Sequence, residues 1–156
     1  MPLHEISSTP LSRLELRDPV RVSPTAPLHE VVSEMTASAR GAAVVQDSAG
    51  RLLGIFTERD LLRAVDVSND QWRARPVGEV MVSELRTIQA TGSLHDAITA
   101  MAEISVRHLP IVRDDGYAVG LLSVRDIVAY VASYFPAEFL NLPPDPDLEA
   151  RSPWGA

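Results

Sequence analysis

The sequence predicts an α/β (α+β) fold made of two consecutive β-α-β-β-α repeats. Three observations support this prediction: similar segments recur at an offset of 66 residues, each copy contains an amphipathic helix, and a continuous apolar segment of strand length follows each helix. A three-stranded sheet with two helices leaves one apolar face exposed, so the two repeats are expected to pack as a pseudo-twofold pair. Any ligand sites would then lie in clefts between the repeats.

The composition is that of a globular chain and excludes several kinds of site. The 156 residues are 46% hydrophobic and contain no apolar run of the roughly 18 residues that cross a bilayer. The first residues show no secretory signal, and there is no cysteine. We therefore expect a cytoplasmic protein with no disulfide, no thiolate metal site and no membrane partner.

Charge limits the partners and the chemistry further. All fourteen cationic side chains are arginine, so no lysine is present for a Schiff base or a phosphate loop. The net charge of −7 opposes binding to nucleic acid, which depends on neutralising phosphates. No metal site is expected, because the four histidines are scattered: His4, His29, His95 and His108. An enzyme such as a nucleotide hydrolase is not expected either, because the sequence has no lysine, no cysteine, no Gly-rich phosphate loop and no carboxylate cluster with metal-binding spacing.

Each repeat is expected to begin with a short strand and an amphipathic helix. Alternating segments predict strands at Val20–Val22 and Leu85–Ile88. Apolar residues at i, i+3, i+4 and i+7 predict helices at Leu28–Met35 and Leu94–Met101, each with one buried face.

A hairpin and a second helix complete each repeat. Continuous apolar runs predict buried strands, and each run is followed by a polar turn and a further strand. The predicted hairpin strands are Ala42–Val45 with Leu52–Phe56, and Leu109–Val112 with Ala118–Leu122. The second helices are expected to begin at Thr57 and Ser123.

The segments outside the repeats differ in composition. A connector over Gln71–Met81 is expected to be partly helical, and residues 136–156 hold five of the twelve prolines, which predicts an extended tail. The predicted organisation is an N-terminal arm (1–13), repeat 1 (14–68), a connector (69–79), repeat 2 (80–135) and a Pro-rich C-terminal tail (136–156).

Two motifs in register point to a known family. Gly54-Ile-Phe-Thr-Glu-Arg-Asp60 and Gly120-Leu-Leu-Ser-Val-Arg-Asp126 each close a β-α-β-β-α unit, and the segment Arg107-His-Leu-Pro-Ile-Val112 is similar to a recurrent strand segment of that family. The chain resembles a tandem CBS domain pair, named after cystathionine β-synthase. The resemblance implies a stand-alone, non-enzymatic regulatory module that requires no cofactor. It also implies an adenosine-containing regulatory ligand between the repeats: AMP, ADP, ATP or S-adenosylmethionine.

The resemblance assigns ribose contacts to Thr57 and Asp60 in the first repeat and to Ser123 and Asp126 in the second. A hydroxyl residue followed three positions later by an acidic residue is also the pattern of a helix capping box. The two roles are compatible, because an aspartate at a helix start can also accept hydrogen bonds from ribose hydroxyls.

Phosphate contacts are predicted for cationic residues near the motifs, with solvated surface arginine as the alternative. These residues are Arg40, Arg59, Arg107, Arg125 and His108. Matching the apolar runs shifts the repeat by one residue here, which pairs Arg40 with Arg107, Gly41 with His108 and Ala43 with Pro110. The cleft of the second repeat is then the one closer to the family pattern.

Base contacts are predicted from the resemblance for Val22, Ser23, Ile88 and Pro110, although a role in the core is the stronger interpretation for the first three. The aromatic cluster Tyr130, Tyr134, Phe135 and Phe139 either folds back on the pair or contacts a second copy. Contact with a second copy is the preferred hypothesis, because CBS-pair proteins commonly form dimers, and a homodimer is expected. The competing hypothesis is a dimeric interaction module with empty clefts, which binds an unidentified protein through its surface and Pro-rich tail.

Overall fold

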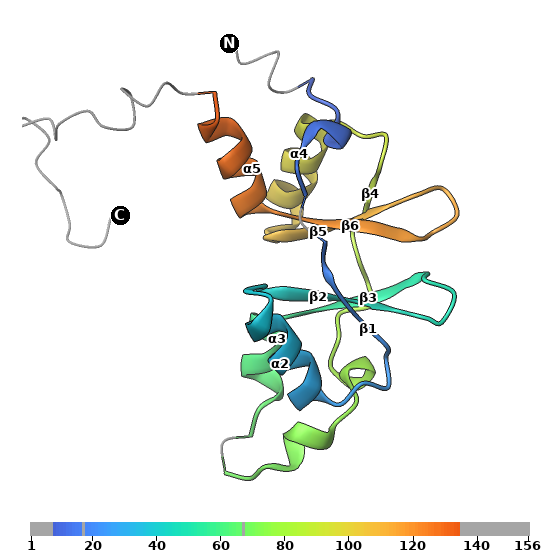
Figure 1. The fold of residues 1–156 in the computed structure, drawn as a ribbon, viewed down its shortest axis with the longest axis vertical. Coiled ribbons are helices and arrows are strands. Elements are labelled where there is room, and N and C mark those ends of the chain that lie inside the picture. Colours follow the sequence, from blue (N-terminus) through green and yellow to red (C-terminus); the bar gives the residue numbers. More distant parts are fainter. Residues whose placement is uncertain (1–7, 17, 67, 135–156) are drawn as a thin grey trace, which may run out of the picture.

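The computed structural model describes residues 8–16, 18–66 and 68–134, and Figure 1 shows their arrangement. The first repeat contains β1 (Val20–Val22), α2 (Leu28–Ala37), β2 (Ala42–Gln46), β3 (Leu52–Thr57) and α3 (Glu58–Ala64). The second contains β4 (Ile88–Gln89), α4 (Leu94–Ile104), β5 (His108–Val112), β6 (Ala118–Ser123) and α5 (Val124–Ala132). Three short 3-10 helices precede the first repeat or connect the two: η1 (Leu11–Arg13), η2 (Gln71–Ala74) and η3 (Val77–Glu79). The predicted pair of β-α-β-β-α repeats is confirmed.

Each repeat contributes one three-stranded sheet. The strand orders are β1-β2-β3 and β4-β5-β6, in which the first pair is parallel and the second antiparallel. The two sheets face each other at the centre of the molecule, and the helices of each repeat lie on the outer side of its sheet (Figure 1). Apolar residues on the inner face of each helix and sheet form two separate cores, one per repeat.

One predicted strand is wrong. Leu85–Ile88 was expected to be extended, but β4 consists of Ile88 and Gln89 alone. Val112 accepts a hydrogen bond from Ala90 on the β4 side, and because strand residues alternate, the backbone nitrogen of Pro110 faces the same side. Proline has no N–H to donate, so β4 begins only at Ile88, after the residue that lies opposite Pro110.

The predicted one-residue shift between the repeats is also wrong. Ala42 pairs with Thr57 and His108 pairs with Ser123, so the offset of 66 residues persists through the hairpins. The loop before β2 and the loop before β5 both contain a left-handed residue, Ala39 with φ 51° and Ser105 with φ 52°. These equal loop lengths leave no room for an insertion.

The corrected register changes which residues are equivalent. Arg107 corresponds to Gly41, His108 to Ala42, and Pro110 to Val44. The backbone hydrogen bonds from Glu58 to Gly41 and from Val124 to Arg107 have the same offset. Arg40 therefore has no arginine counterpart in repeat 2, because Val106 occupies that position.

The segment that precedes each repeat packs on the core of the other repeat. Leu11 and Leu14 are buried in the core of repeat 2, and Val77, from the connector, is fully buried in the core of repeat 1. In Figure 1 the N-terminal segment starts beside α4 and runs down to β1, while the chain after η3 runs upward to β4. The repeats are therefore interlocked rather than merely adjacent.

Backbone hydrogen bonds hold both exchanged segments in the same way. Leu11 donates to Gly92 and Leu94 donates to Thr9, which fixes η1 against the start of α4. The equivalent bonds, from Val77 to Ala26 and from Leu28 to Arg75, fix η3 against the start of α2. The connector is helical in part, as predicted, although both of its turns are 3-10 helices.

The aromatic residues at the end of α5 contact this N-terminal segment. Tyr130 packs against the core of repeat 2 and donates a hydrogen bond to Thr9, and its hydroxyl also lies 2.5 Å from that of Tyr134. Tyr130 therefore folds back on its own chain, whereas Phe135, Phe139 and the predicted tail lie outside the described residues. Within the described ranges, no helix has the length and apolar character needed to cross a membrane.

We predict opposite responses to one substitution at two equivalent glycines. A Cβ at Gly54 would lie 2.6 Å from the sulfur of Met81 and 2.8 Å from the carbonyl oxygen of Val82, where the connector crosses β3. A Cβ at Gly120 would have no neighbour closer than 3.6 Å. Gly54→Ala is expected to lower the free energy of unfolding by about 1–3 kcal/mol, because the backbone contact must move.

Gly120→Ala is the matched control and is expected to change the free energy of unfolding by less than about 1 kcal/mol. Urea unfolding followed by circular dichroism measures both variants. Equal stabilities of the two variants would contradict the close contact between the connector and β3.

Candidate functional site

A cleft of about 820 Å³ opens between the two repeats. Both motifs line it, with Thr57 and Asp60 from the start of α3 and Ser123 and Asp126 from the start of α5. All five predicted phosphate contacts also line it: Arg40, Arg59, Arg107, Arg125 and His108. The fold therefore brings residues from both repeats, distant in sequence, to one concave surface.

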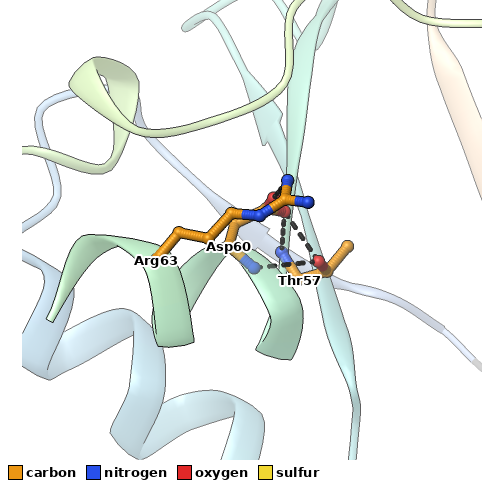
Figure 2. A network of polar contacts seen from close by, with 3 residues as sticks. All are labelled: Thr57, Asp60 and Arg63. Atoms are coloured by element: carbon orange, nitrogen blue, oxygen red, sulfur yellow. Dashed lines mark hydrogen bonds and ion pairs between the residues drawn. The ribbon is translucent and has the colours of Figure 1, made fainter.

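In the first repeat the motif forms a complete capping box. The backbone N–H and the hydroxyl of Thr57 both donate to Oδ2 of Asp60, at 2.9 and 2.6 Å, and the N–H of Asp60 donates back to the Thr57 hydroxyl. Asp60 is only 7% exposed. Its other oxygen, Oδ1, takes part in none of these bonds and lies 4.0 Å from the guanidinium of Arg63 (Figure 2).

The second repeat repeats this geometry without the arginine. The N–H and hydroxyl of Ser123 donate to Oδ2 of Asp126, which completes the capping box of α5. Oδ1 of Asp126 has no hydrogen-bond or ion-pair partner among the described residues. The capping role of both motifs is confirmed, and it uses one carboxylate oxygen of each aspartate.

A third capping box lies outside the cleft. Ser93 and Asp96 make the same three bonds at the start of α4, and these bonds lower the pKa of the exposed Asp96 carboxyl. The sequence analysis missed this box, although Ser93 and Asp96 have the spacing of the other two. A hydroxyl-x-x-Asp pattern thus indicates the start of a helix. Whether the two residues also line the cleft depends on where that helix lies in the fold.

The cleft is cationic although the chain is acidic. Six of the fourteen arginines line it, but only four of the twenty-one carboxylate residues do. Among the described residues, the guanidinium groups of Arg59, Arg107 and Arg125 have no hydrogen-bond or ion-pair partner, whereas that of Arg40 donates to the carbonyl oxygen of Asp18. A concave surface with free guanidinium groups is suited to an anionic ligand.

His108 adds a neutral donor to this surface. Burial lowers the pKa of the imidazole, and nearby Arg107 lowers it further, while Glu58 and Asp126 act in the opposite direction. The ring is therefore neutral at pH 7 and carries one N–H that can donate a hydrogen bond.

Several cleft residues were missed by the sequence analysis. Glu58 and Arg63 flank the first motif, and Glu84 and Arg86 line the opposite part of the cleft. Glu58 stands inside the motif and could have been found there. Arg86 could not have been found from the sequence, because it lies in the predicted strand Leu85–Ile88, of which only Ile88 is a strand residue in the structure.

Three of the predicted base contacts lie outside the cleft. Val22 and Ile88 are each 8% exposed and belong to the two cores, because alternation along the strand turns them toward the helices. Ser23 lies in the turn after β1, beside a separate shallow depression. Pro110 does line the cleft, although its side chain is almost completely buried.

No grouping suited to a metal is present in the part of the chain that the structure describes. No set of three or more histidine, aspartate or glutamate side chains gathers there closely enough to hold an ion.

Comparison with known proteins matches both repeats to one family. The CBS domain matches residues 11–67 and 77–133. A mitochondrial CBS domain-containing protein of Arabidopsis thaliana is 32% identical over 119 residues, which are 74% of this chain and 57% of that protein. The chain thus spans little more than half of that relative.

Solved structures have the same fold. An uncharacterised conserved protein of Pyrococcus horikoshii is 25% identical with a TM-score of 0.72, over 83% of this chain and 96% of that one. A CBS domain protein of Pyrobaculum aerophilum, solved in complex with AMP, is 31% identical with a TM-score of 0.68, over 79% and 98% of the two chains.

CBS-pair proteins are regulatory modules. Each matched range contains one of the two interlocked repeats, and together the two ranges cover most of the sequence. The chain belongs to the CBS domain family and contains a tandem pair of these domains.

Proposed function

We propose that this chain is a non-enzymatic, cytoplasmic sensor that binds an adenosine nucleotide in the cleft between its repeats and thereby changes its conformation or its affinity for a protein partner. The observation that carries the proposal is the meeting of both Ser/Thr-x-x-Asp motifs and six arginines in one cleft of about 820 Å³. AMP, ADP and ATP are the candidate ligands, so the module would respond to the energy state of the cell. S-adenosylmethionine is an additional candidate.

The free groups of the cleft match the parts of a nucleotide. The unbonded Oδ1 of Asp126 can accept hydrogen bonds from the two ribose hydroxyls without disturbing the capping box. The hydroxyls of Thr57 and Ser123 have already committed their protons to the aspartates, so they can only accept from a ligand. Arg59, Arg107 and Arg125 are the phosphate contacts.

The relative from Pyrobaculum aerophilum supports the class of ligand. It is 31% identical to this chain and was solved in complex with AMP. No comparable support distinguishes AMP from ADP or ATP, so the experiment must compare them directly.

We expect an adenosine-selective increase in thermal stability. A ligand present at 100 times its Kd adds about 2.7 kcal/mol to the free energy of unfolding, which raises the Tm of a chain of this size by about 5–10 °C. Melting curves with millimolar AMP, ADP, ATP, S-adenosylmethionine, NAD and GTP measure this increase. No shift with any of the six would favour the alternative function, an interaction module with empty clefts.

A second prediction separates ligand binding from helix capping. Asp126→Ala and Asp96→Ala each remove the acidic residue of a capping box, so each is expected to cost about 1 kcal/mol in the absence of ligand. Only Asp126→Ala removes a carboxylate from the cleft, and it alone is expected to abolish the Tm increase caused by the nucleotide. If both variants retain the full increase, Asp126 is not a ligand contact.

We also propose that the chain forms a homodimer through the outer faces of α3 and α5. Leu62 and Val128 occupy equivalent positions on these helices and are 82% and 59% exposed. Large apolar side chains that stand out so far on two related helices form a surface that a second copy can cover with the same surface of its own.

The double variant Leu62→Glu, Val128→Glu is expected to halve the mass measured by light scattering, because it buries four like charges in the proposed interface. Val119→Glu is the matched control, since Val119 is 41% exposed but lies on β6 away from these helices. A parent mass equal to one chain, 17.0 kDa, would contradict the dimer.

A further inference from the structure

The two halves of the cleft have the same backbone but different side chains. Glu58, Gly41 and Arg63 line the half at repeat 1. The equivalent residues of repeat 2 are Val124, Arg107 and Ala129, of which the first two line the cleft. Asp60 and Asp126 form the same capping box but therefore have different surroundings.

Arg63 competes with a ligand for Asp60. Its guanidinium lies over the carboxylate, 4.0 Å from Oδ1, which is the oxygen that the capping box leaves unbonded (Figure 2). Ala129 has no group that could reach Asp126 in this way. A diol would have to displace Arg63 in the first half, whereas it meets an open acceptor in the second.

Glu58 brings a negative charge to the first half of the cleft, and this charge also acts on the imidazole of His108. Its carboxylate lies 3.3 Å from the position that a Cβ on Gly41 would occupy, so it covers the backbone between β2 and α3. In the second half Val124 replaces the carboxylate, and Arg107 replaces the glycine. The same region thus changes from acidic to cationic between the two repeats.

The remaining charges strengthen this difference. Arg40 is held by its hydrogen bond to Asp18, which leaves Arg59 as the only described cation of the first half without a partner. In the second half Arg107 and Arg125 are both unpaired, and His108 adds an N–H donor where repeat 1 has Ala42. A phosphate group is therefore favoured beside repeat 2.

We infer that the chain binds one nucleotide, in the half of the cleft formed by Asp126, Arg107, Arg125 and His108, and that Glu58 and Arg63 keep the other half empty. This inference rests on the proposed function and specifies the site and its occupancy. Glu58 and Val124 are the residues that determine which half accepts an anionic ligand.

Calorimetric titration with AMP and with ATP tests the inference. The parent is expected to bind about one nucleotide per chain. Asp126→Asn is expected to weaken binding by about tenfold or more, because the acceptor of the ribose hydroxyls loses its charge, while Asp60→Asn changes the Kd by less than about threefold. Asp96→Asn, in the box outside the cleft, serves as the control for loss of capping, and a melting curve of each variant shows that it is folded.

Exchanging the residues at positions 58 and 124 tests the inference more directly than the aspartate variants do. Val124→Glu is expected to weaken binding by about tenfold or more, because it places a carboxylate beside the phosphate. Glu58→Val is expected to leave binding in the half at repeat 2 unchanged and to allow binding in the half at repeat 1. The number of nucleotides bound per chain would then rise toward two.

Two results would overturn the inference while the proposed function stands: two equal sites in the parent, or an equal loss of affinity in Asp60→Asn and Asp126→Asn. A parent that binds neither AMP nor ATP at millimolar concentration would overturn both this inference and the proposed function.

Discussion

The structure depends on the exchange of one short segment between the two repeats. Leu11 and Leu14 complete the core of repeat 2, and Val77 completes the core of repeat 1. Neither repeat has a closed core without the segment that the sequence assigns to its neighbour. This exchange holds the two sheets face to face, and the cleft between them exists only as long as both segments are in place. The pseudo-twofold arrangement of the site is thus a direct result of how the cores are closed.

The two carboxylate oxygens of each cleft aspartate have different surroundings. One carboxylate oxygen of Asp60 and Asp126 caps a helix, and the other is directed to a different use. Capping fixes the side chain, so the second oxygen is held in place before any ligand arrives, and little conformational entropy is lost on binding. Asp126 therefore combines a capping role with the proposed binding role, whereas the second oxygen of Asp60 lies beside Arg63.

Much of the fold could be predicted from the sequence, because periodicity and the recurring motifs report local structure and burial directly. The helices at Leu28 and Leu94 and both hairpins were predicted correctly. The failures involved relations between strands. Matching the apolar runs aligned Ala43 with Pro110, because every residue of such a run is buried and the pattern does not define the register. The backbone pairing shows that Pro110 corresponds to Val44. The predicted site residues near the motifs reached the cleft. Val22 and Ile88 did not, because strand alternation turned them into the cores, and Glu58 was missed although it stands inside the first motif.

The exchanged segments also govern when the molecule can acquire its native contacts during synthesis. Leu11 leaves the ribosome about a hundred residues before Leu109 and Leu122, with which it shares a core. The core of repeat 1 also stays incomplete until Val77 has emerged. The nascent chain therefore carries the apolar η1 turn without a partner until repeat 2 has been made, and the two repeats finish folding together rather than in succession.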